Sequence, residues 1–564
     1  MNTNSQSNHE IFSLIDKIKH EPNNSQHFYD LGLKYKSLGD FKKAAIYLEK
    51  AVALKPDSEL SNLYYGTCKL ELKDYPDAIK AFVSALKINP SRADTYNILG
   101  IALIDVGLTY ESTLQFMQAI KLDPNHAAAY DNLGRANLSL GRQNDSVQAH
   151  YKSYQLSGNK LTYSNYLYAL NCLEAIDEKT LSHLHRKTYL EESKVSHSLD
   201  HATHKPVKLG FVSGDFLNHA VSYFFIPLIE NIDKNTFKVF CFSANSSVDE
   251  TTLKIKRLVD EYHDISSRDD QTVAAFIRSK KIDILIDLSG HTGHNRLGIF
   301  ALRAAKKQVT WLGYPNTTGL SEIDYRITDA ATDPEEVNDV NYSEKLIRLP
   351  KCFLTYQPFK NAPPVVNTPA LKNNYITFGS FNNIAKVNPQ LVKVWSKILS
   401  AIPNSRLLIH SKGLHHHNNS AYILKLFTDN AITPDRISFS GEILSREDHF
   451  KKYSLVDIGL DTFPYNGTTT TCECLWMGIP VITFCGIPHR SRVGASLLGQ
   501  LNHPDWITHS ISDYINQVVR LASDISHINS IRKNLRLEMS NSALCDSKDF
   551  ALRFEHALNT ILST

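Results

Sequence analysis

The sequence lacks the paired cysteines that metal cages and disulfide frameworks need. Its eight cysteines are scattered over 564 residues, no C-x-x-C pair occurs, and the closest two are Cys472 and Cys474. The run His415–His417 predicts a polar loop, because three consecutive side chains point in different directions. We therefore expect a protein of a reducing compartment that holds no metal ion.

Long apolar runs and a strong charge of one sign are also missing. No stretch approaches the ~18 apolar residues that a membrane helix needs, and the first ten residues, MNTNSQSNHE, lack the features of a signal peptide. The formal net charge of +3 is too small to indicate binding to nucleic acid or to an acidic membrane. These absences predict a cytoplasmic protein that binds neither.

Two common phosphate-binding signatures are absent as well. No G-x-G-x-x-G follows a predicted strand, which argues against a dinucleotide-dependent dehydrogenase. No G-x-x-x-x-G-K-[ST] occurs, so a P-loop NTPase is not expected.

A period of 34 residues organises the first part of the chain. Four registers begin at Ser25, Glu59, Ala93 and Ala127. The recurring residues are Gly32, Gly66, Gly100 and Gly134 at position 8, Ala44, Ala78, Ser112 and Ser146 at position 20, and Pro56, Pro90, Pro124 and Gly158 at position 32. This pattern is typical of tetratricopeptide repeats, each a pair of antiparallel helices. Stacked repeats form a solenoid whose concave face binds a peptide or a partner protein, or which merely supports its neighbour.

The boundaries of the expected parts follow from changes of pattern. Residues 1–24 form an N-terminal segment, 25–160 the four repeats, and 161–206 a helical cap and a polar junction. Residues 207–358 and 372–564 form two lobes, separated by a proline-rich linker at 359–371.

In both lobes short apolar strands alternate with helices. Expected strands are Lys208–Ser213, Val239–Ser243, Asp283–Leu288 and Gln308–Leu312, then Tyr375–Phe381, Arg406–His410, Ile437–Ser440, Ile458–Leu460 and Pro480–Phe484. Such alternation predicts parallel sheets covered by helices on both faces. Two lobes of this kind place a ligand cleft at the carboxyl ends of their strands, as in glycosyltransferases, epimerases and phosphorylases.

Four segments carry a resemblance to a known family. They are GFVSGDFLNHAVSY at Gly210–Tyr223, WLGYPNTTG at Trp311–Gly319, FGSFNNIAK at Phe378–Lys386 and DTFPYNGTTTTCECLWMGIP at Asp461–Pro480. These segments closely resemble glycosyltransferase family 41, which contains the nucleocytoplasmic O-GlcNAc transferases and the SPINDLY proteins. The resemblance implies an all-α tetratricopeptide solenoid followed by an α/β two-lobed GT-B glycosyltransferase fold. It also implies an inverting transferase that moves a sugar from a nucleotide donor to Ser or Thr hydroxyls of proteins.

Sugar transfer requires that the leaving diphosphate be stabilised. Many metal-dependent transferases do this through an Asp-x-Asp pair, which this sequence lacks, so positive side chains and backbone N–H groups are expected to do so without a cofactor. Lys386 matches the family lysine that contacts the donor phosphates, beside the amides Asn382 and Asn383. The threonines Thr468, Thr469 and Thr470 are expected to open a helix whose N–H groups and hydroxyls bind phosphate, because an N-cap alone needs only one of them.

Further matches surround the sugar and the nucleoside. His219 matches a histidine at the sugar site, where it could transfer a proton or orient the sugar or acceptor. His449 matches a histidine near the base and ribose, and Glu473 an acidic residue that accepts hydrogen bonds from the ribose.

Two more matches lie in the first lobe. Gly313, Tyr314 and Pro315 match a turn whose backbone approaches the sugar, and Arg296 matches a basic residue near donor and acceptor.

Some positions depart from the animal enzymes. A carboxylate considered as their base aligns with Ala275, so the base is left open, and the histidine ahead of their threonine pair is Thr468. The stretches Ile282–Arg326 and Tyr375–Asn404 look more like SPINDLY proteins, whose plant members use GDP-fucose.

The donor is therefore expected to be UDP-GlcNAc first, with GDP-fucose second and UDP-glucose a further option. A catalytically decayed repeat scaffold and a nucleotide-sugar epimerase are the alternatives. The retained His219, Lys386, Thr469, Thr470 and Glu473 argue against decay, and an epimerase would not need a peptide-binding solenoid.

Overall fold

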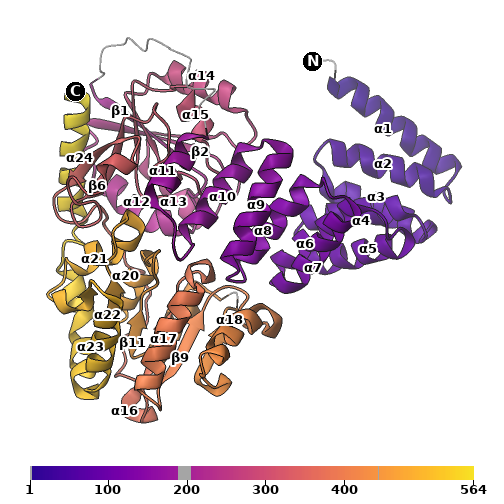
Figure 1. The fold of residues 1–564 in the computed structure, drawn as a ribbon. Helices are drawn as coiled ribbons and strands as arrows, with labels where there is room; N and C mark the ends of the chain where they lie inside the picture. Colours follow the sequence, from indigo (N-terminus) through magenta and orange to yellow (C-terminus); the bar gives the residue numbers. More distant parts are fainter. Residues whose placement is uncertain (1–2, 189–204, 443) are drawn as a thin grey trace. The chain divides into compact units, whose positions relative to one another are not determined.

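The computed structural model describes residues 3–188, 205–442 and 444–564, and it divides into two compact units. The first unit comprises Met1–Gly158 with His416–Asn419, and the second comprises Asn159–His415 with Ser420–Thr564. Figure 1 shows the first as stacked helices and the second as two sheets covered by helices. No helix in the part of the chain that the structure describes is long and apolar enough to cross a membrane.

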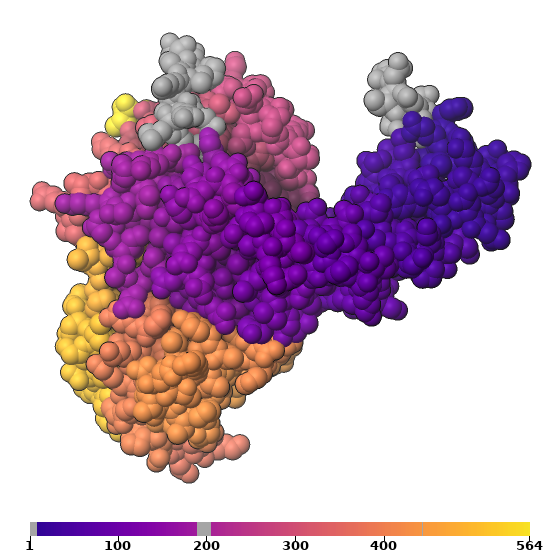
Figure 2. Space-filling model, turned by 45° about the vertical axis from the view of Figure 1, so that its right-hand side comes forward, coloured from indigo at the N-terminus to yellow at the C-terminus, as the bar shows by residue number. Residues whose placement is uncertain are grey.

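Helical pairs build the first unit, as the 34-residue period predicts. Helix α1 (Thr3–His20) precedes them. The four pairs are α2 (Ser25–Ser37) with α3 (Phe41–Leu54), α4 (Glu59–Glu71) with α5 (Tyr75–Ile88), α6 (Ala93–Asp105) with α7 (Thr109–Leu122), and α8 (Ala127–Leu138) with α9 (Gln143–Ser157). They form the continuous indigo-to-purple surface of Figure 2.

The glycine of each repeat lets the two helices of a pair approach closely. Gly100 of α6 faces Phe116 of α7, and a Cβ at Gly100 would overlap the Phe116 ring. The same geometry places Gly32 against Leu48 in the first repeat. In the fourth repeat Gly134 faces a histidine, His150, instead of an apolar side chain. The recurring glycine is therefore required by packing.

The second unit begins with a helical hairpin. Helix α10 (Lys160–Asn171) and helix α11 (Glu178–Arg186) confirm that this segment is helical as far as it is described, while its role as a cap of the repeats stays a prediction. The rest of that prediction, residues 189–199, lies outside the described residues.

The first lobe contains a parallel sheet of seven strands in the order β3-β2-β1-β4-β5-β6-β7. The strands are β1 (Val207–Ser213), β2 (Phe237–Ser243), β3 (Glu261–Asp264), β4 (Ile284–Asp287), β5 (Lys307–Thr310), β6 (Tyr325–Asp329) and β7 (Lys345–Leu349). The helices are α12 (Ala220–Asn231), α13 (Glu250–Leu258), α14 (Asp270–Lys280) and α15 (Leu297–Ala301). The four strands expected here are confirmed as β1, β2, β4 and β5.

The second lobe contains a sheet of six strands in the order β10-β9-β8-β11-β12-β13. The strands, all parallel, are β8 (Thr377–Ser380), β9 (Arg406–His410), β10 (Ile437–Ser440), β11 (Ile458–Leu460), β12 (Val481–Phe484) and β13 (Ile507–Thr508). The helices are α16 (Ala370–Asn373), α17 (Pro389–Ala401), α18 (His417–Asp429), α19 (Arg446–Lys452), α20 (Thr469–Trp476), α21 (Val493–Leu498), α22 (Ile511–Ala522) and α23 (Ile525–Ser540). All five strands expected in this lobe are confirmed as β8 to β12.

The last helix, α24 (Ser547–Ser563), packs against α12 and β7 of the first lobe. The sequence pattern placed this segment with the second lobe. The apolar face of α24 includes Phe554, whose ring centroid lies 4.8 Å from that of Trp311 at the end of β5. Both rings are fully buried, so α24 completes the core of the first lobe.

Gly100→Ala tests the packing of the repeats. Alanine is the better helix former by about 1 kcal/mol, but overpacking against Phe116 costs roughly 1–3 kcal/mol. We expect the packing cost to exceed the propensity gain, so the thermal unfolding midpoint of the repeats falls. As a control, Gly293→Ala meets no atom within 4 Å and should leave stability within about 0.5 kcal/mol of the wild type. A midpoint raised by Gly100→Ala would show that the crossing is looser than described.

Candidate active site

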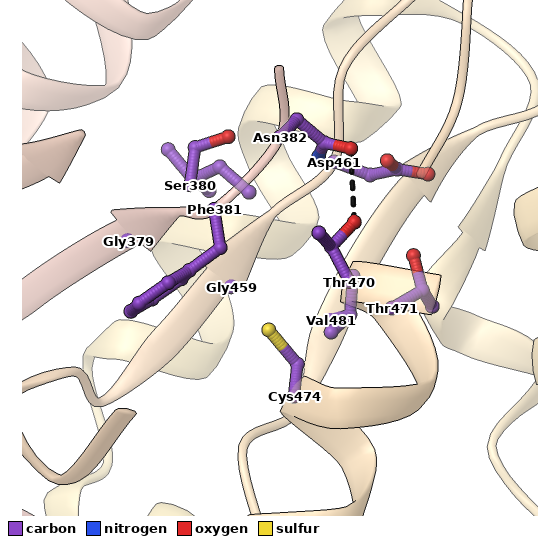
Figure 3. A pocket seen from close by; sticks show the side chains of 11 residues that line it. Gly379, Ser380, Phe381, Asn382, Gly459, Asp461, Thr470, Thr471, Cys474 and Val481 are labelled. Atoms are coloured by element: carbon purple, nitrogen blue, oxygen red, sulfur yellow. Dashed lines mark hydrogen bonds between the residues drawn. The ribbon is translucent and has the colours of Figure 1, made fainter. Parts of the chain in front are cut away.

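The carboxyl ends of β8 and β11 lie side by side, and polar residues follow both strands. Asn382 comes after β8, and Asp461 comes directly after β11. With the first turn of α20 they line a small pocket (Figure 3), where the side chains of Asn382 and Thr470 point toward each other. The Thr470 hydroxyl donates to Asn382 Oδ1 at 2.9 Å. The structure thus brings two predicted donor-binding residues together.

Asp461 organises the turn from β11 to α20. Its Oδ1 accepts hydrogen bonds from the backbone N–H groups of Thr462 at 2.8 Å and Gly467 at 2.7 Å, and its Oδ2 accepts from the Thr483 hydroxyl at 2.6 Å. Burial raises the pKa of this carboxyl to about 6. With its bonds committed to the turn, Asp461 serves as a structural anchor.

Lys386 reaches this turn from the short 3-10 helix Ile384–Lys386. Its Nζ donates to the carbonyl oxygen of Asn466 at 2.8 Å and lies 3.9 Å from the centroid of the Tyr465 ring. Burial lowers the pKa of Lys386 to about 8, with Asp461 opposing the effect. The ammonium is charged at neutral pH and has hydrogens left for an anionic ligand.

The N-terminus of α20 presents N–H groups beside this lysine. Thr468 precedes the helix, and its side chain makes no capping hydrogen bond. The first N–H groups of a helix have no partner within the helix, so those that begin at Thr469 are suited to an anion. Asn383 caps the 3-10 helix Ile384–Lys386, where its side chain accepts a hydrogen bond from the N–H of Ala385 at 3.0 Å.

A larger cavity of about 430 Å³ adjoins the second lobe and also includes first-lobe residues. It is lined by Asn218, Tyr223, His410, Lys412, Glu442, Leu444, Arg446, His449 and Glu473. His449 and Glu473, both expected near a nucleoside, meet there, with His449 Nε2 3.3 Å from Glu473 Oε2. Glu473 also accepts from the hydroxyl of Tyr453 at 2.8 Å.

His410 and Arg446 belong to this cavity but were missed from the sequence. His410 Nε2 lies 3.2 Å from His449 Nδ1, and burial lowers the pKa of His410 to about 4. The Arg446 guanidinium lies 3.8 Å from the Tyr223 ring centroid, and its buried Nε and Nη2 have no hydrogen-bond partner among the described residues. A charged donor left unpaired beside a cavity suits a ligand rich in acceptors. Arg446 lies three residues before His449, and this proximity is the one sequence signal that could have identified it.

On the first lobe, His219 caps the N-terminus of α12 directly after the loop that follows β1. Its Nδ1 accepts from the N–H of Val221 at 3.4 Å and lies 3.6 Å from Asp215 Oδ2. The imidazole is 46% exposed, whereas Asp215 is 16% exposed and burial raises the pKa of its carboxyl. Because Nδ1 faces the protein, Nε2 is the atom available to a ligand. The neighbouring Asn218 lines the 430 Å³ cavity.

The turn at Gly313–Pro315 is held by the first lobe and by the α10–α11 hairpin. A Cβ at Gly313 would overlap the carbonyl oxygen of Leu288, so only glycine fits. The buried Tyr314 hydroxyl accepts from Asn171 Nδ2 at 2.6 Å and lies 2.8 Å from His185 Nε2, so this side chain is a structural anchor. The Gly313 N–H donates to the Trp311 carbonyl at 2.9 Å and the Tyr314 carbonyl accepts from Arg326 Nη2 at 2.9 Å, so part of the turn's backbone is also committed within the protein.

Arg296 is hydrogen-bonded to other residues of the first lobe. Its Nε pairs with Asp270 Oδ1 at 2.6 Å, and its other nitrogens donate to the carbonyls of Ile265 at 2.9 Å and Arg268 at 2.7 Å. These bonds tie the guanidinium to loops of the first lobe. A donor contact of Arg296 stays a prediction that these contacts do not support.

Lys386→Met tests whether the ammonium is held at a cost in stability. The folded pKa of about 8 lies below the ordinary value of 10.5, so between these values the unfolded chain binds more protons and stability rises with pH. Below pH 8 the buried charge destabilises the fold. We expect Lys386→Met to raise the thermal midpoint at pH 7 by on the order of 2 °C, and the difference to shrink by pH 10. A variant less stable than the wild type at pH 7 would contradict this.

Comparison with known proteins agrees with the resemblance seen in the motifs. The model of glycosyl transferase family 41 matches residues 138–360 and 365–554, and a tetratricopeptide repeat model matches residues 29–105. Two similar proteins are named probable UDP-N-acetylglucosamine–peptide N-acetylglucosaminyltransferase SPINDLY. That of Oryza sativa subsp. japonica is 40% identical over 73% of this chain and 45% of its own length, and that of Arabidopsis thaliana is 42% identical over 63% and 39%.

The chain thus spans less than half the length of these curated relatives. Among solved structures, a mutant O-GlcNAc transferase of Thermobaculum terrenum superposes with a TM-score of 0.82 at 27% identity, covering 89% of this chain and 97% of that one. With a family model that matches most of its length, the chain belongs to glycosyltransferase family 41.

Proposed function

We propose that this protein is an inverting, metal-independent O-glycosyltransferase that transfers GlcNAc from UDP-GlcNAc to Ser or Thr hydroxyls of protein acceptors. The observation that carries the proposal is the half-buried Lys386 ammonium beside the N-terminus of α20, at the carboxyl edge of the second sheet. The names of the SPINDLY relatives and of the superposed O-GlcNAc transferase support the same reaction.

Lys386 and α20 suit the departure of a diphosphate. In the transfer, the acceptor oxygen bonds to C1 of the sugar while the bond from C1 to the diphosphate oxygen breaks, and the configuration at C1 inverts. Negative charge grows on the leaving diphosphate and a proton leaves the acceptor hydroxyl. A preorganised ammonium and helix N–H groups stabilise that charge with little reorganisation.

His219 is proposed for the sugar or acceptor side of the reaction. Its Nδ1 lies against the Val221 N–H and Asp215, which leaves Nε2 for a ligand. Either proton transfer from the acceptor or orientation of the sugar is compatible with this geometry. The pH profile of His219→Ala separates the two, because only loss of a base removes an ionisation from the rate.

The 430 Å³ cavity is proposed to hold the nucleoside. Its size falls in the range of small-molecule sites. Glu473 would accept from ribose hydroxyls, and the unpaired nitrogens of Arg446 would donate to acceptor atoms of the nucleotide.

GDP-fucose is the second candidate donor, because parts of the sequence resemble SPINDLY proteins. The names of the SPINDLY relatives favour UDP-GlcNAc. The acceptors are proposed to be proteins or peptides bound along the concave face of the repeats.

A donor panel tests the proposal. Purified protein is incubated separately with UDP-GlcNAc, GDP-fucose and UDP-glucose, and donor hydrolysis and transfer to protein are measured. We expect activity with UDP-GlcNAc, and we expect Lys386→Ala to lower kcat by ~10²–10³-fold while changing donor KM little, since its interaction strengthens toward the transition state. Lys386→Arg should recover only part of the rate.

A normal kcat with raised KM in Lys386→Ala would make this lysine a ground-state anchor. Activity with GDP-fucose alone would change the proposed donor from UDP-GlcNAc to GDP-fucose and would leave the proposed site residues unchanged. No activity with any donor would favour a decayed scaffold.

Chelation tests metal independence. Because a lysine and helix N–H groups are proposed to stabilise the diphosphate, the rate in EDTA should equal the untreated rate. Loss of activity in EDTA that Mn²⁺ or Mg²⁺ restores would refute the leaving-group chemistry.

A further inference from the structure

The α10–α11 hairpin, read from the sequence only as a cap, reaches the environment of Lys386 from outside the second lobe. The hairpin is attached to the first lobe by buried bonds. Ser164 Oγ lies 2.8 Å from His291 Nδ1, and Asn171 bonds both the Tyr314 hydroxyl at 2.6 Å and Asn316 Nδ2 at 2.9 Å. The hairpin therefore holds a defined position in the catalytic unit.

A pair of tyrosines forms the first route from the hairpin to Lys386. Tyr168 of α10 meets Tyr465 edge to face, with ring centroids 6.3 Å apart and an interplanar angle of 62°. The Tyr465 ring in turn lies 3.9 Å from Lys386 Nζ, within cation–π range. This route therefore runs through contacts of the two rings.

An ion pair forms the second route. Glu178 of α11 binds the buried Arg490 through two bonds, of 3.0 and 2.5 Å. The carbonyl of Arg490 accepts the N–H of Asn466 at 2.8 Å, and the carbonyl of Asn466 accepts Lys386 Nζ at 2.8 Å. Both partners of the ammonium, the ring and the carbonyl, are thus braced from the hairpin.

We propose that Tyr168 and Glu178 are positioning residues for the Lys386 ammonium, which they hold by bracing Tyr465 and Asn466. This inference rests on the proposed role of Lys386 at the donor diphosphate. The brace fixes the point toward which the diphosphate must depart and keeps water from the ammonium. The residues that contact the leaving group belong to the second lobe, whereas their alignment is set by a hairpin attached to the first.

The pH dependence of nucleotide binding reports on this brace. The groups that face Lys386 are Asp461 on the β11–α20 turn, Cys172 at the end of α10, and Tyr465. Burial raises the pKa of the Cys172 thiol to about 12 and the pKa of the Tyr465 phenol above its ordinary range. Below pH 10, Lys386 is thus the group in this cluster that loses its charge near pH 8.

The experiment measures UDP affinity, and in parallel GDP affinity, by calorimetry from pH 6 to 10 on the full chain, with kcat for the active donor. In the wild type, affinity should fall above pH 8 as Lys386 deprotonates. Tyr168→Ala admits water, so the fall should move to higher pH by about 1 unit, while kcat drops about 10-fold or more through misplacement of the ammonium. Tyr168→Phe keeps the ring and should match the wild type in both.

Leu161→Ala is the control on the same helix, because that side chain is 51% exposed, and it should change neither readout. If Tyr168→Ala does not fold, Tyr168→Leu is measured in the same way. A reduced kcat with an unmoved pH profile, or full activity of Tyr168→Ala, overturns the brace.

The proposed function fails in a different way. If Lys386→Ala binds UDP and GDP as the wild type does, with the same alkaline fall, the role of Lys386 is wrong. Suppose instead that Lys386→Ala abolishes the loss of UDP affinity above pH 8, while in Tyr168→Ala this loss occurs at the same pH as in the wild type. Lys386 then keeps its proposed role, and only the brace is refuted.

Discussion

A half-buried ammonium that forms no ion pair with the described carboxylates is the constraint on which the catalytic unit depends. Lys386 is held by one carbonyl and one aromatic face, partners that locate a charge but do not neutralise it. Asp461, the acidic group that affects its ionisation, directs its oxygens to the turn before α20. A cation held in this way lowers stability and is suited to an anion that arrives later. The arrangement of the strand ends around it follows from that need.

The two lobes contribute unequal parts of the site. The second lobe supplies the lysine, the helix N-terminus and most of the lining of the 430 Å³ cavity, all near the carboxyl ends of parallel strands. The first lobe adds His219 at the start of α12 and the walls formed by Asn218 and Tyr223. Such a division suits a donor held mainly by one lobe and an acceptor that approaches from the other.

The periodic and local features could be predicted from the sequence, and the long-range partners could not. The repeats were predictable because glycine and small residues recur at a fixed spacing. The strands β1 and β4 are mainly apolar, with the sequences VKLGFVS and ILID, whereas the edge strand β3 has the polar sequence EYHD and is not predicted. Lys386 and Thr470 could be predicted because each belongs to a family motif that follows a strand.

Other contacts depend on residues far apart in the chain. Tyr168 lies almost 300 positions before its partner Tyr465, and nothing in the spacing of either predicts their contact. Arg296 is a further example. Its guanidinium is paired with Asp270, a contact that only the three-dimensional arrangement reveals.

The return of α24 to the first lobe changes what the interlobe linker can do. The chain crosses between the lobes at the linker and again before α24, whose Phe554 packs on Trp311. Trp311 stands immediately before the Leu312–Pro315 turn, so this turn is supported by residues from the far end of the polypeptide. The two lobes are therefore joined by two chain crossings instead of one, and the second crossing is anchored by a buried aromatic contact.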